Sequence, residues 1–325
     1  MAVKVGINGF GRIGRMALRS IIENKRKDLE VVAINNKANN EISSFLLKHD
    51  TVHGNLKSKV SYSEKTIDVE GKKIQVIHET DIEKIDWKKF NVDVVLECTG
   101  KFTKKEKSMQ HIKAGAKKVI VSAPVPNSVN IVYGVNEKIL KSTDQVISAA
   151  SCTTNCLATV CKVLNDNFEI ERGFMTTVHS YTPDQRLLDN SHKDLRRARS
   201  APNAIVPTTT GATKYVAEVI PNLKGKIDGI SIRVPTPTVS LVEFVFSSSK
   251  NLTVENLNNN FLKASKTDLK NILDTTEEPL VSSDFIHNYN SSIVDLSLTK
   301  VINDKMAKIS AWYDNEWGFS NRMCD

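Results

Sequence analysis

The sequence predicts an α/β protein with two domains: a first domain built on a parallel sheet between helices, and an α+β domain built on a mixed or antiparallel sheet. The chain has 325 residues, more than one hydrophobic core usually organises. In its first part, short apolar runs alternate with helical stretches, the pattern of a parallel sheet covered on both faces. After about Ser151 this alternation gives way to several strand-like segments that follow one helix.

Strands and helices alternate from the first residues of the chain. Val3–Asn8 is predicted as a strand, Arg12–Asn24 as a helix with apolar residues near helical spacing, and Leu29–Ile34 as a second strand. Val92–Glu97 and Val119–Ser122 are apolar runs that end in turn residues, so both are predicted as strands.

The second half begins with a predicted helix over Cys152–Leu164 and has another near Val254–Ala264. Its predicted strands are Phe174–His179, Ile227–Val234, Val239–Phe246, Ile293–Leu298 and Lys308–Trp312. The stretch Tyr181–Pro207 is polar, rich in arginine and without a convincing strand. A loop of this length in a compact protein is usually functional or covered by an interface.

Composition and charge exclude several classes of protein. Apolar residues make up 40% and charged residues 25% of the chain, as in ordinary folded proteins. The longest apolar runs are strand-sized, and the N-terminus carries no secretion signal, so we expect a cytosolic protein without membrane spans. The net charge of +8 is spread along the chain, and no nucleic-acid partner is expected. The five cysteines form neither a disulfide framework nor a zinc pattern, so no metal site is expected.

A glycine-rich turn stands between the first predicted strand and helix. It comprises Gly9, Phe10, Gly11, Arg12, Ile13 and Gly14. In a GxGxxG turn the first glycine permits a tight turn, the second lets the backbone approach a pyrophosphate, and the third lets the helix pack on the strand. At a strand–helix junction this pattern predicts a Rossmann-type dinucleotide-binding domain.

The second predicted strand lacks the acidic residue that holds the 2′-hydroxyl of NAD. It ends in Asn36, which offers no carboxylate to that hydroxyl and no repulsion to a 2′-phosphate. NADP is therefore permitted as well as NAD.

Cys152 is the cysteine best placed for chemistry. Ser151 is a good helix N-cap and would put Cys152 in the first helical turn, where the helix dipole favours the thiolate. The alternative, that the cysteine is inert packing, suits Cys156 and Cys161 better. His179 is the best candidate base because it ends an apolar strand and precedes a polar loop, although spacing alone does not prove contact. His49, His53, His78, His111, His192 and His287 are interpreted as surface or packing residues.

Groups suited to binding anions gather in the second half. They include Thr182, Arg196, Arg197, the turn Thr208–Gly211 before a helix, and Arg233 in an apolar strand. The alternative to an anion-binding site is that these residues form a solvated basic face. Arg233 fits this alternative least, because it lies in an apolar strand.

Seven characteristic segments occur in order along the chain: INGFGRIGR (7–15), SCTTNC (151–156), TTVHSYT (176–182), HKDLRRAR (192–199), PTTTGATK (207–214), RVPTPTVS (233–240) and WYDNEWGFSNR (312–322). Through them the chain resembles the phosphorylating glyceraldehyde-3-phosphate dehydrogenase family over residues 3–325. This resemblance implies a cofactor domain at 1–151 completed by 315–325, a catalytic domain at 152–314, and a homotetramer in which the long loop lies at an interface.

The resemblance also implies a reaction and a set of binding residues. Cys152 would form a thioester that inorganic phosphate cleaves, with His179 as the base and with NAD or NADP as the cofactor. The C3 phosphate of glyceraldehyde 3-phosphate would meet Thr182, Asp184 and Arg233. The attacking phosphate would meet Ser151, Thr153, Thr210, Gly211 and one of Arg196 or Arg197. Further cofactor contacts would come from Thr80, Thr99, Gly100, Ser122, Ser191 and Asn315.

Several positions depart from the family pattern. Asn36 replaces the usual Asp, and Asn190-Ser191 resembles relatives that accept NADP, whereas Thr80 replaces an adenosine-side Arg and weakens a 2′-phosphate clamp. Phe319 replaces the usual Tyr, as in erythrose-4-phosphate dehydrogenases, which are the nearest alternative. The intact Thr208–Gly211 turn and the pair of Thr182 and Asp184 favour glyceraldehyde 3-phosphate. RNA binding through the basic surface is a weaker alternative of another class.

Overall fold

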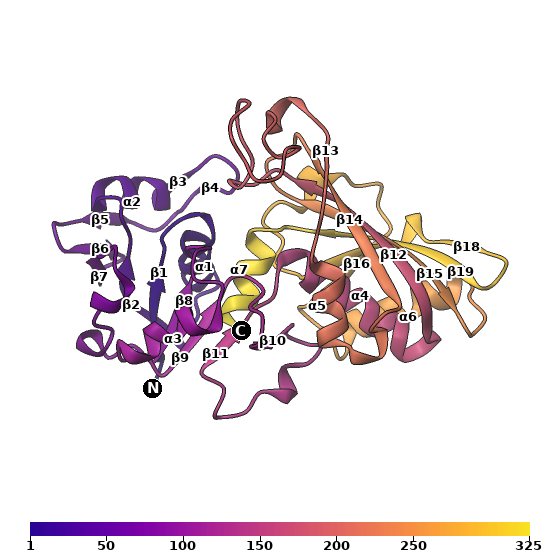
Figure 1. Ribbon diagram of the computed structural model, residues 1–325, viewed down its shortest axis with the longest axis horizontal. Helices are drawn as coiled ribbons and strands as arrows, with labels where there is room; N and C mark the ends of the chain where they lie inside the picture. Colours follow the sequence, from indigo (N-terminus) through magenta and orange to yellow (C-terminus); the bar gives the residue numbers. More distant parts are fainter. The chain divides into compact units, whose positions relative to one another are not determined.

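The computed structural model describes every residue from Met1 to Asp325. The chain divides into two compact units (Figure 1). The first unit comprises Met1–Ile131, Lys138–Ala150 and Ser320–Asp325, and the second comprises Val132–Glu137 and Ser151–Phe319.

The first unit is built on a nine-stranded sheet with the order β10-β11-β9-β8-β1-β2-β7-β6-β5. The strands from β10 to β7 are all parallel. Their bounds are β1 (Val3–Asn8), β2 (Leu29–Asn35), β7 (Lys72–Ile77), β8 (Val94–Glu97), β9 (Lys118–Val121), β10 (Val129–Asn130) and β11 (Val146–Ser148). The chain leaves β1 toward β2 on one side and returns to β8 on the other. This change of direction creates a crevice at the carboxyl ends of the strands.

The far edge of this sheet differs from the predicted parallel sheet. β5 (Val60–Tyr62), β6 (Thr66–Val69) and β7 form an antiparallel meander. Glu70 and Gly71 connect β6 to β7, and both have a positive φ. Two such residues form the kind of tight turn that matches the twist of a hairpin, which explains why this edge reverses direction.

Helices flank the sheet of the first unit: α1 (Arg12–Glu23), α2 (Asn40–Lys48) and α3 (Lys105–Lys113). Short 3-10 helices occur at Ile82–Lys84, Lys88–Phe90 and Glu137–Ile139, and β3 (His49–Asp50) pairs with β4 (Gly54–Asn55). A core cluster around the fully buried Trp87 includes Val95, Val119 and Val121. The sequence predicted α1 to within one residue but did not predict α2 or α3.

The second unit is built on an eight-stranded mixed sheet, as predicted. Its main order is β13-β14-β12-β15-β19-β17-β16, and β18 pairs with β19. The pairs β12–β14 and β16–β17 are parallel and the others are antiparallel. The strands are β12 (Ile170–Ser180), β13 (Val206–Thr208), β14 (Ile227–Val234), β15 (Ser240–Ser248), β16 (Leu273–Thr276), β17 (Ser292–Asp295), β18 (Lys300–Ile302) and β19 (Met306–Tyr313).

Helix α4 (Cys152–Phe168) packs against α5 (Ala212–Val219), α6 (Val254–Lys266) and the strands of this sheet (Figure 1). The 3-10 helices of the second unit are Ala201–Asn203, Pro221–Leu223, Ser282–Phe285 and Leu296–Leu298. The last helix of the chain, α7 (Trp317–Cys324), was not predicted. No helix has the length and apolar character needed to cross a membrane.

The predicted strand Ile293–Leu298 is wrong in its second half. The strand ends at Asp295, and Leu296–Leu298 form a 3-10 helix instead. The hydroxyl of Ser297 donates a hydrogen bond of 2.6 Å to the Asp295 carboxylate. Such a local side-chain bond competes with strand pairing and favours a turn.

Candidate active site

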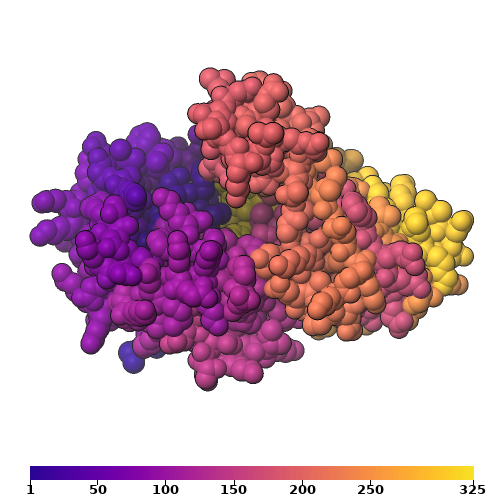
Figure 2. Space-filling view, viewed as in Figure 1, coloured from indigo at the N-terminus to yellow at the C-terminus, as the bar shows by residue number.

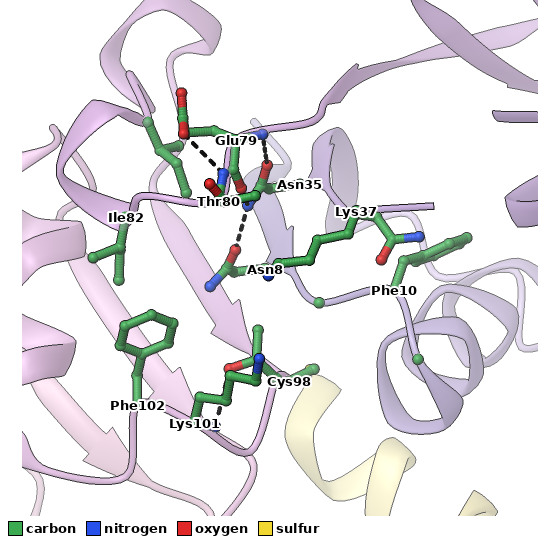
Figure 3. Close-up of a pocket in the computed structure, with 15 residues that line it drawn as sticks. Asn8, Phe10, Asn35, Lys37, Glu79, Thr80, Ile82, Cys98, Lys101 and Phe102 are labelled. Carbon is green, nitrogen blue, oxygen red and sulfur yellow. Dashed lines mark hydrogen bonds between the residues drawn. The ribbon is translucent and has the colours of Figure 1, made fainter. Parts of the chain in front are cut away.

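A cavity of about 270 Å³ opens at the crevice of the first unit (Figure 3). Its lining comes from the carboxyl ends of three neighbouring strands: Asn8 and Gly9 after β1, Asn35 and Asn36 at β2, and Cys98 and Thr99 after β8. Phe10, Gly11, Lys37, Glu79, Thr80, Ile82, Ile85, Lys101 and Phe102 complete it. Open α/β sheets bind their ligands at such a crevice.

Glycine is suited to each of the three positions in the turn for a different physical reason. Gly9 has a φ of +92°, which glycine adopts without steric cost. A Cβ on Gly14 would lie 2.2 Å from the carbonyl oxygen of Gly9, so only glycine allows α1 to pack here. A Cβ on Gly11 would meet nothing within 4 Å. Gly11 also caps α1 without a side-chain hydrogen bond, so the helix N-terminus stays suited to an anion.

A buried hydrogen-bond network supports the floor of this cavity, and the sequence did not predict it. The Glu97 carboxylate accepts the Asn8 amide at 2.6 Å and the Thr99 backbone N–H at 2.8 Å, as well as the Thr99 hydroxyl. The Trp87 indole N–H donates to His111 Nδ1 at 2.9 Å, so His111 is the tautomer whose Nε2–H donates to Glu97 at 3.0 Å. This network ties the end of β1 to the turn after β8.

Polar and cationic groups stand where the end of β2 meets the cavity. The Asn36 amide donates to the Ser43 hydroxyl at 3.0 Å, and the exposed Thr80 follows Glu79. Lys37 and Lys101 also line the cavity, and neither was among the predicted cofactor residues. Two lysines and no carboxylate at Asn36 make this a cationic environment, although Glu79 contributes one acidic group.

Cys152 stands in the second unit at the N-terminus of α4, as the sequence predicted. The Ser151 hydroxyl accepts the Thr154 backbone N–H at 3.1 Å and so caps the helix. Cys152 keeps part of its surface open to solvent, whereas Cys156 and Cys161 are buried in packing. Ala150, just before the cap, has a φ of +57°, so the turn into α4 carries local backbone strain.

His179 lies beside Cys152. The distance from its Nε2 to the Cys152 Sγ is 3.6 Å. Its Nδ1 is 2.7 Å from the Ser180 carbonyl oxygen, which only accepts, so Nδ1 carries the proton and Nε2 faces the sulfur with a lone pair. Parallel pairing of β12 with β14 places His179 next to Arg233. Arg233 donates to the Ser180 carbonyl and the Thr182 hydroxyl, each at 3.3 Å.

Burial and the Arg233 charge set the proton affinities of this pair. Burial raises the pKa of the Cys152 thiol, while the positive charge of Arg233 acts to lower it. Burial, followed by the same charge, lowers the pKa of His179 to about 3. Each group alone is therefore neutral near pH 7. Proton transfer from sulfur to Nε2 would charge both together, as an ion pair at the helix N-terminus.

A second cluster of polar groups surrounds Arg197. Its guanidinium donates to the Asp184 carboxylate at 2.5 Å, the Thr208 hydroxyl at 3.0 Å and the Thr209 carbonyl at 3.2 Å. The positive charge of Arg197 contributes to lowering the pKa values of His179 and Arg233, so it acts on the same site. The Arg196 side chain is exposed, and its guanidinium donates only to the Pro207 carbonyl, at 3.5 Å. Of the two arginines, Arg197 is therefore the one that contacts Asp184 and the Thr208–Gly211 turn.

Tyr313 and Asn315 are buried in the second unit and are held by hydrogen bonds to neighbouring hydroxyl groups. The Tyr313 hydroxyl is 2.8 Å from the hydroxyls of both Thr153 and Thr177. The Asn315 carbonyl oxygen accepts from Ser180 at 2.9 Å and Ser240 at 3.1 Å, which leaves its NH₂ group as a donor. Tyr313 was not predicted, although it lies within a segment that carried the family resemblance.

The structure does not bring every predicted residue to one of these sites. Arg12 forms an ion pair with Asp50, and Arg12, Ile13, Gly14, Gly100 and Ser122 are not among the residues that line the cavity. Ser191 lies in the exposed loop of the second unit, where its backbone N–H donates to Asn190 at 2.7 Å. Thr210 accepts the Ala212 N–H at 3.1 Å at the start of α5, next to the exposed Gly211.

A crevice on a Rossmann-type unit, followed by a mixed-sheet unit that pairs a cysteine with a histidine, characterises a class of two-domain NAD-binding dehydrogenases. Comparison with known proteins identifies the family within this class. The family model described as "Glyceraldehyde 3-phosphate dehydrogenase, NAD binding domain" matches residues 3–105, and the C-terminal domain model of the same name matches residues 151–315. The chain belongs to the glyceraldehyde-3-phosphate dehydrogenase family.

Curated relatives agree with this over the whole chain. The glyceraldehyde-3-phosphate dehydrogenase of Zymomonas mobilis is 52% identical over 328 residues, which cover all of this chain and 97% of the relative. The enzyme of Geobacillus stearothermophilus is 53% identical over 327 residues with the same coverage. Glyceraldehyde-3-phosphate dehydrogenase 2 of Bacillus subtilis is 49% identical over 327 residues, covering all of this chain and 96% of the relative.

Proposed function

We propose that the protein oxidises D-glyceraldehyde 3-phosphate with inorganic phosphate, reversibly, to give 1,3-bisphosphoglycerate. The observation that carries the proposal is the 3.6 Å approach of His179 Nε2 to the Cys152 Sγ, at the N-terminus of α4. A thiolate there is a strong nucleophile, and a neutral imidazole beside it is a base. Family membership supports the substrate.

In this mechanism His179 Nε2 takes the Cys152 thiol proton as the sulfur attacks the aldehyde carbon, and it passes that proton to the carbonyl oxygen to form a thiohemiacetal. His179 Nε2 then removes that hydroxyl proton. A dinucleotide held by the first unit would accept the hydride from the same carbon, and loss of the hydride and the proton leaves a thioester on Cys152. An inorganic phosphate oxygen attacks the thioester, the carbon–sulfur bond breaks, and Cys152 leaves as the thiolate. The Cys152 backbone N–H and the His179 ring stabilise the oxyanion.

Two groups of side chains fit the two phosphates. Arg233 and Thr182 are hydrogen-bonded to each other beside His179 and suit the C3 phosphate of the substrate. Arg197, with Ser151, Thr153, Thr210 and Gly211, suits the attacking phosphate. Asp184 bears a negative charge and holds Arg197, so we assign it the role of positioning that guanidinium.

The residues of the first unit fit a nicotinamide dinucleotide, and the family model supports NAD. The open space at Gly11 and the uncapped N-terminus of α1 suit its pyrophosphate. Asn315 would donate its NH₂ hydrogens to the nicotinamide amide. Asn36 and Lys37 in the cavity, with no carboxylate at the end of β2, support the use of NADP as well as NAD.

We further propose a homotetrameric, cytosolic enzyme. Leu187, Leu188 and Leu195 of the long loop are exposed by 75%, 76% and 83% of their surface. Exposed apolar side chains gathered on one segment are normally covered in an assembly, so these leucines support an interface at this loop.

The test of the reaction is Cys152→Ser with Cys156→Ser as its matched control. Cys152→Ser is expected to abolish aldehyde oxidation while dinucleotide binding persists, because an alcohol is a far poorer nucleophile than a thiolate. Cys156→Ser should keep most of its turnover. Iodoacetamide should label Cys152 faster than Cys156 or Cys161, as peptide mass spectrometry would show. Substantial turnover in Cys152→Ser would refute the thioester mechanism.

Asn36 and Phe319 also favour a second substrate, erythrose 4-phosphate. Steady-state kinetics on both sugar phosphates, with and without inorganic phosphate, would compare the two. We expect a higher kcat/KM for glyceraldehyde 3-phosphate, because Thr182, Arg233 and Arg197 are all in place for the two phosphates. A higher kcat/KM for erythrose 4-phosphate would reverse this assignment.

A further inference from the structure

The first unit contains a second and larger cavity, of about 730 Å³, which shares no lining residue with the dinucleotide cavity. Its apolar walls include Leu18 and Ile21 of α1, Val31 of β2, and Ile74 of β7. Ligand pockets typically have volumes of roughly 300–1,000 Å³ and predominantly apolar walls. This cavity has both properties, and the proposed reaction does not use it.

The cavity arises where two strands of the sheet separate. β2 and β7 pair only from Ala33 and Gln75 to Asn35 and Ile77. Before that point, Leu29–Val31 pair with β1 alone, and Lys72–Ile74 pair with β6 alone. Side chains from both separated segments line the cavity. The opening therefore lies where β2 and β7 diverge, beside α1.

Basic residues surround this apolar cleft. Lys25, Arg26, Lys27, Lys72 and Lys73 line it together with two acidic residues, Glu30 and Glu70. Arg26 is paired with Asp28 and Asp325, but none of the four lysines takes part in an ion pair or a side-chain hydrogen bond. An unpaired cluster of lysines beside buried leucine, isoleucine and valine side chains is complementary to a molecule with an anionic head and an alkyl tail.

We propose that this cleft is a binding site for a medium- or long-chain alkyl carboxylate. The alkyl chain lies between the separated segments of β2 and β7, against Ile21 and Ile74. The carboxylate lies among Lys25, Lys27, Lys72 and Lys73 at the surface. A small inorganic anion would leave the apolar walls uncovered, and an uncharged alkane would leave the lysines unmatched, so both parts of the ligand are needed.

The test is a fluorescence titration of the full-length protein with dansyl-labelled undecanoic acid. Binding of one molecule per chain, with a blue shift and without displacement by saturating NAD, is the expected result. Unlabelled dodecanoic acid should displace the probe, and dodecanol should not. The double variant Lys27→Glu/Lys73→Glu should weaken binding by about tenfold or more, because it replaces two positive charges beside the carboxylate with two negative ones.

The matched control is Lys105→Glu/Lys107→Glu, which makes the same charge change at exposed positions of α3. It should bind the probe within about twofold of the parent protein, since neither lysine lines the cleft and exposed charges are screened by salt. Absence of binding, displacement by NAD, equal competition by dodecanol, or equal weakening in both double variants would each overturn the proposal. So would retention on phosphatidylserine vesicles without binding of the dispersed acid, which would indicate a membrane surface instead.

Discussion

At the scale of single residues, the pair of Cys152 and His179 shows how position sets reactivity. Parallel pairing of β12 and β14 puts Arg233 next to His179, and the Ser180 carbonyl fixes the imidazole tautomer. Burial and the Arg233 charge both disfavour an isolated imidazolium. His179 is therefore neutral in the resting site, as the base of the proposed mechanism must be.

His179→Asn is expected to lower turnover by on the order of 10² to 10⁴, because general base catalysis contributes about that much. The alkylation rate of Cys152 against pH should shift to higher pH, since burial raises the pKa of the thiol and no base remains to take its proton. Stopped-flow alkylation with iodoacetamide measures this shift. An unchanged profile would mean that another group activates the thiol.

The folded-state pKa of His179 also has a consequence for stability. His179 has a pKa of about 3 in the folded protein and an ordinary value near 6.5 when unfolded. Between these two values only the unfolded chain takes up the proton, so the free energy of unfolding falls as pH drops from about 6.5 toward 3. Urea titrations over this range should show a smaller loss in His179→Asn than in the parent protein.

The two neighbouring arginines provide a matched comparison for the phosphate site. Arg197→Ala is expected to raise the KM for inorganic phosphate about tenfold or more, since a hydrogen bond to a charged group contributes roughly 1.5–3 kcal/mol. Arg196→Ala should change it little, because this side chain is exposed and its guanidinium contacts the Pro207 carbonyl rather than Asp184 or the Thr208 hydroxyl. A larger effect from Arg196→Ala would mean that Arg196, and not Arg197, binds the inorganic phosphate.

At the scale of elements, local signals in the sequence predicted some structures well and missed others for physical reasons. β1 and β14 were predicted with their observed bounds, because each is an apolar run with clear ends. α3 has only two buried residues, Ser108 and His111, so it presents no apolar stripe that a pattern could reveal. The hydrogen-bond role of Glu97 could not be predicted either, because its partners His111 and Asn8 lie 14 and 89 positions away in the sequence.

The residues of the candidate site likewise include some that local sequence signals could predict and some that they could not. Gly9, Gly11 and Cys152 could be predicted because a strand–helix junction and a helix N-terminus are local features. The proximity of Cys152 to His179 depends on how α4 packs against the sheet, which spacing along the chain cannot reveal. Lys37 and Lys101 were missed because lysines are ordinary surface residues until a cavity places them together.

We expect the end of β2 to influence cofactor choice, and we expect the parent enzyme to use both NAD and NADP. Asn36→Asp combined with Ser191→Pro should give strong NAD selectivity, because a carboxylate repels the 2′-phosphate. In the expected tetramer the loop reaches toward a neighbour's cofactor, where proline in place of Ser191 would remove a donor. Steady-state kinetics with both cofactors measures the ratio. Parent turnover with NADP below about a hundredth of that with NAD, a gap near 2.7 kcal/mol, would contradict this.

Asn39→Asp is the matched control for this change. It places the same charge three residues further on, where Asn39 caps α2 and does not line the cavity. Aspartate is also a good N-cap, so the helix should be unaffected. A shift in cofactor ratio equal to that of Asn36→Asp would mean that general charge, rather than contact with the 2′-phosphate, sets the preference.

At the scale of the whole molecule, the long loop has too few apolar residues to form a core of its own. In Figure 2 the loop, coloured salmon, projects from the surface at the top of the view. Its side chains are tied mostly to one another: Arg199 pairs with Asp189 at 2.7 Å, and Arg186 donates to the Ser191 carbonyl at 2.9 Å. These internal bonds shape the loop while leaving its leucines exposed.

The expected assembly is a tetramer held in part by this loop. Light scattering at micromolar concentration should give the mass of four chains. Leu187→Lys/Leu188→Lys should reduce that mass, because it places charges where apolar side chains would be buried. Ile139→Lys/Leu140→Lys alters a comparable exposed apolar pair in the first unit and should leave the mass unchanged. A monomeric parent protein would refute the assembly, and equal dissociation of both double variants would show that the loop is not the contact.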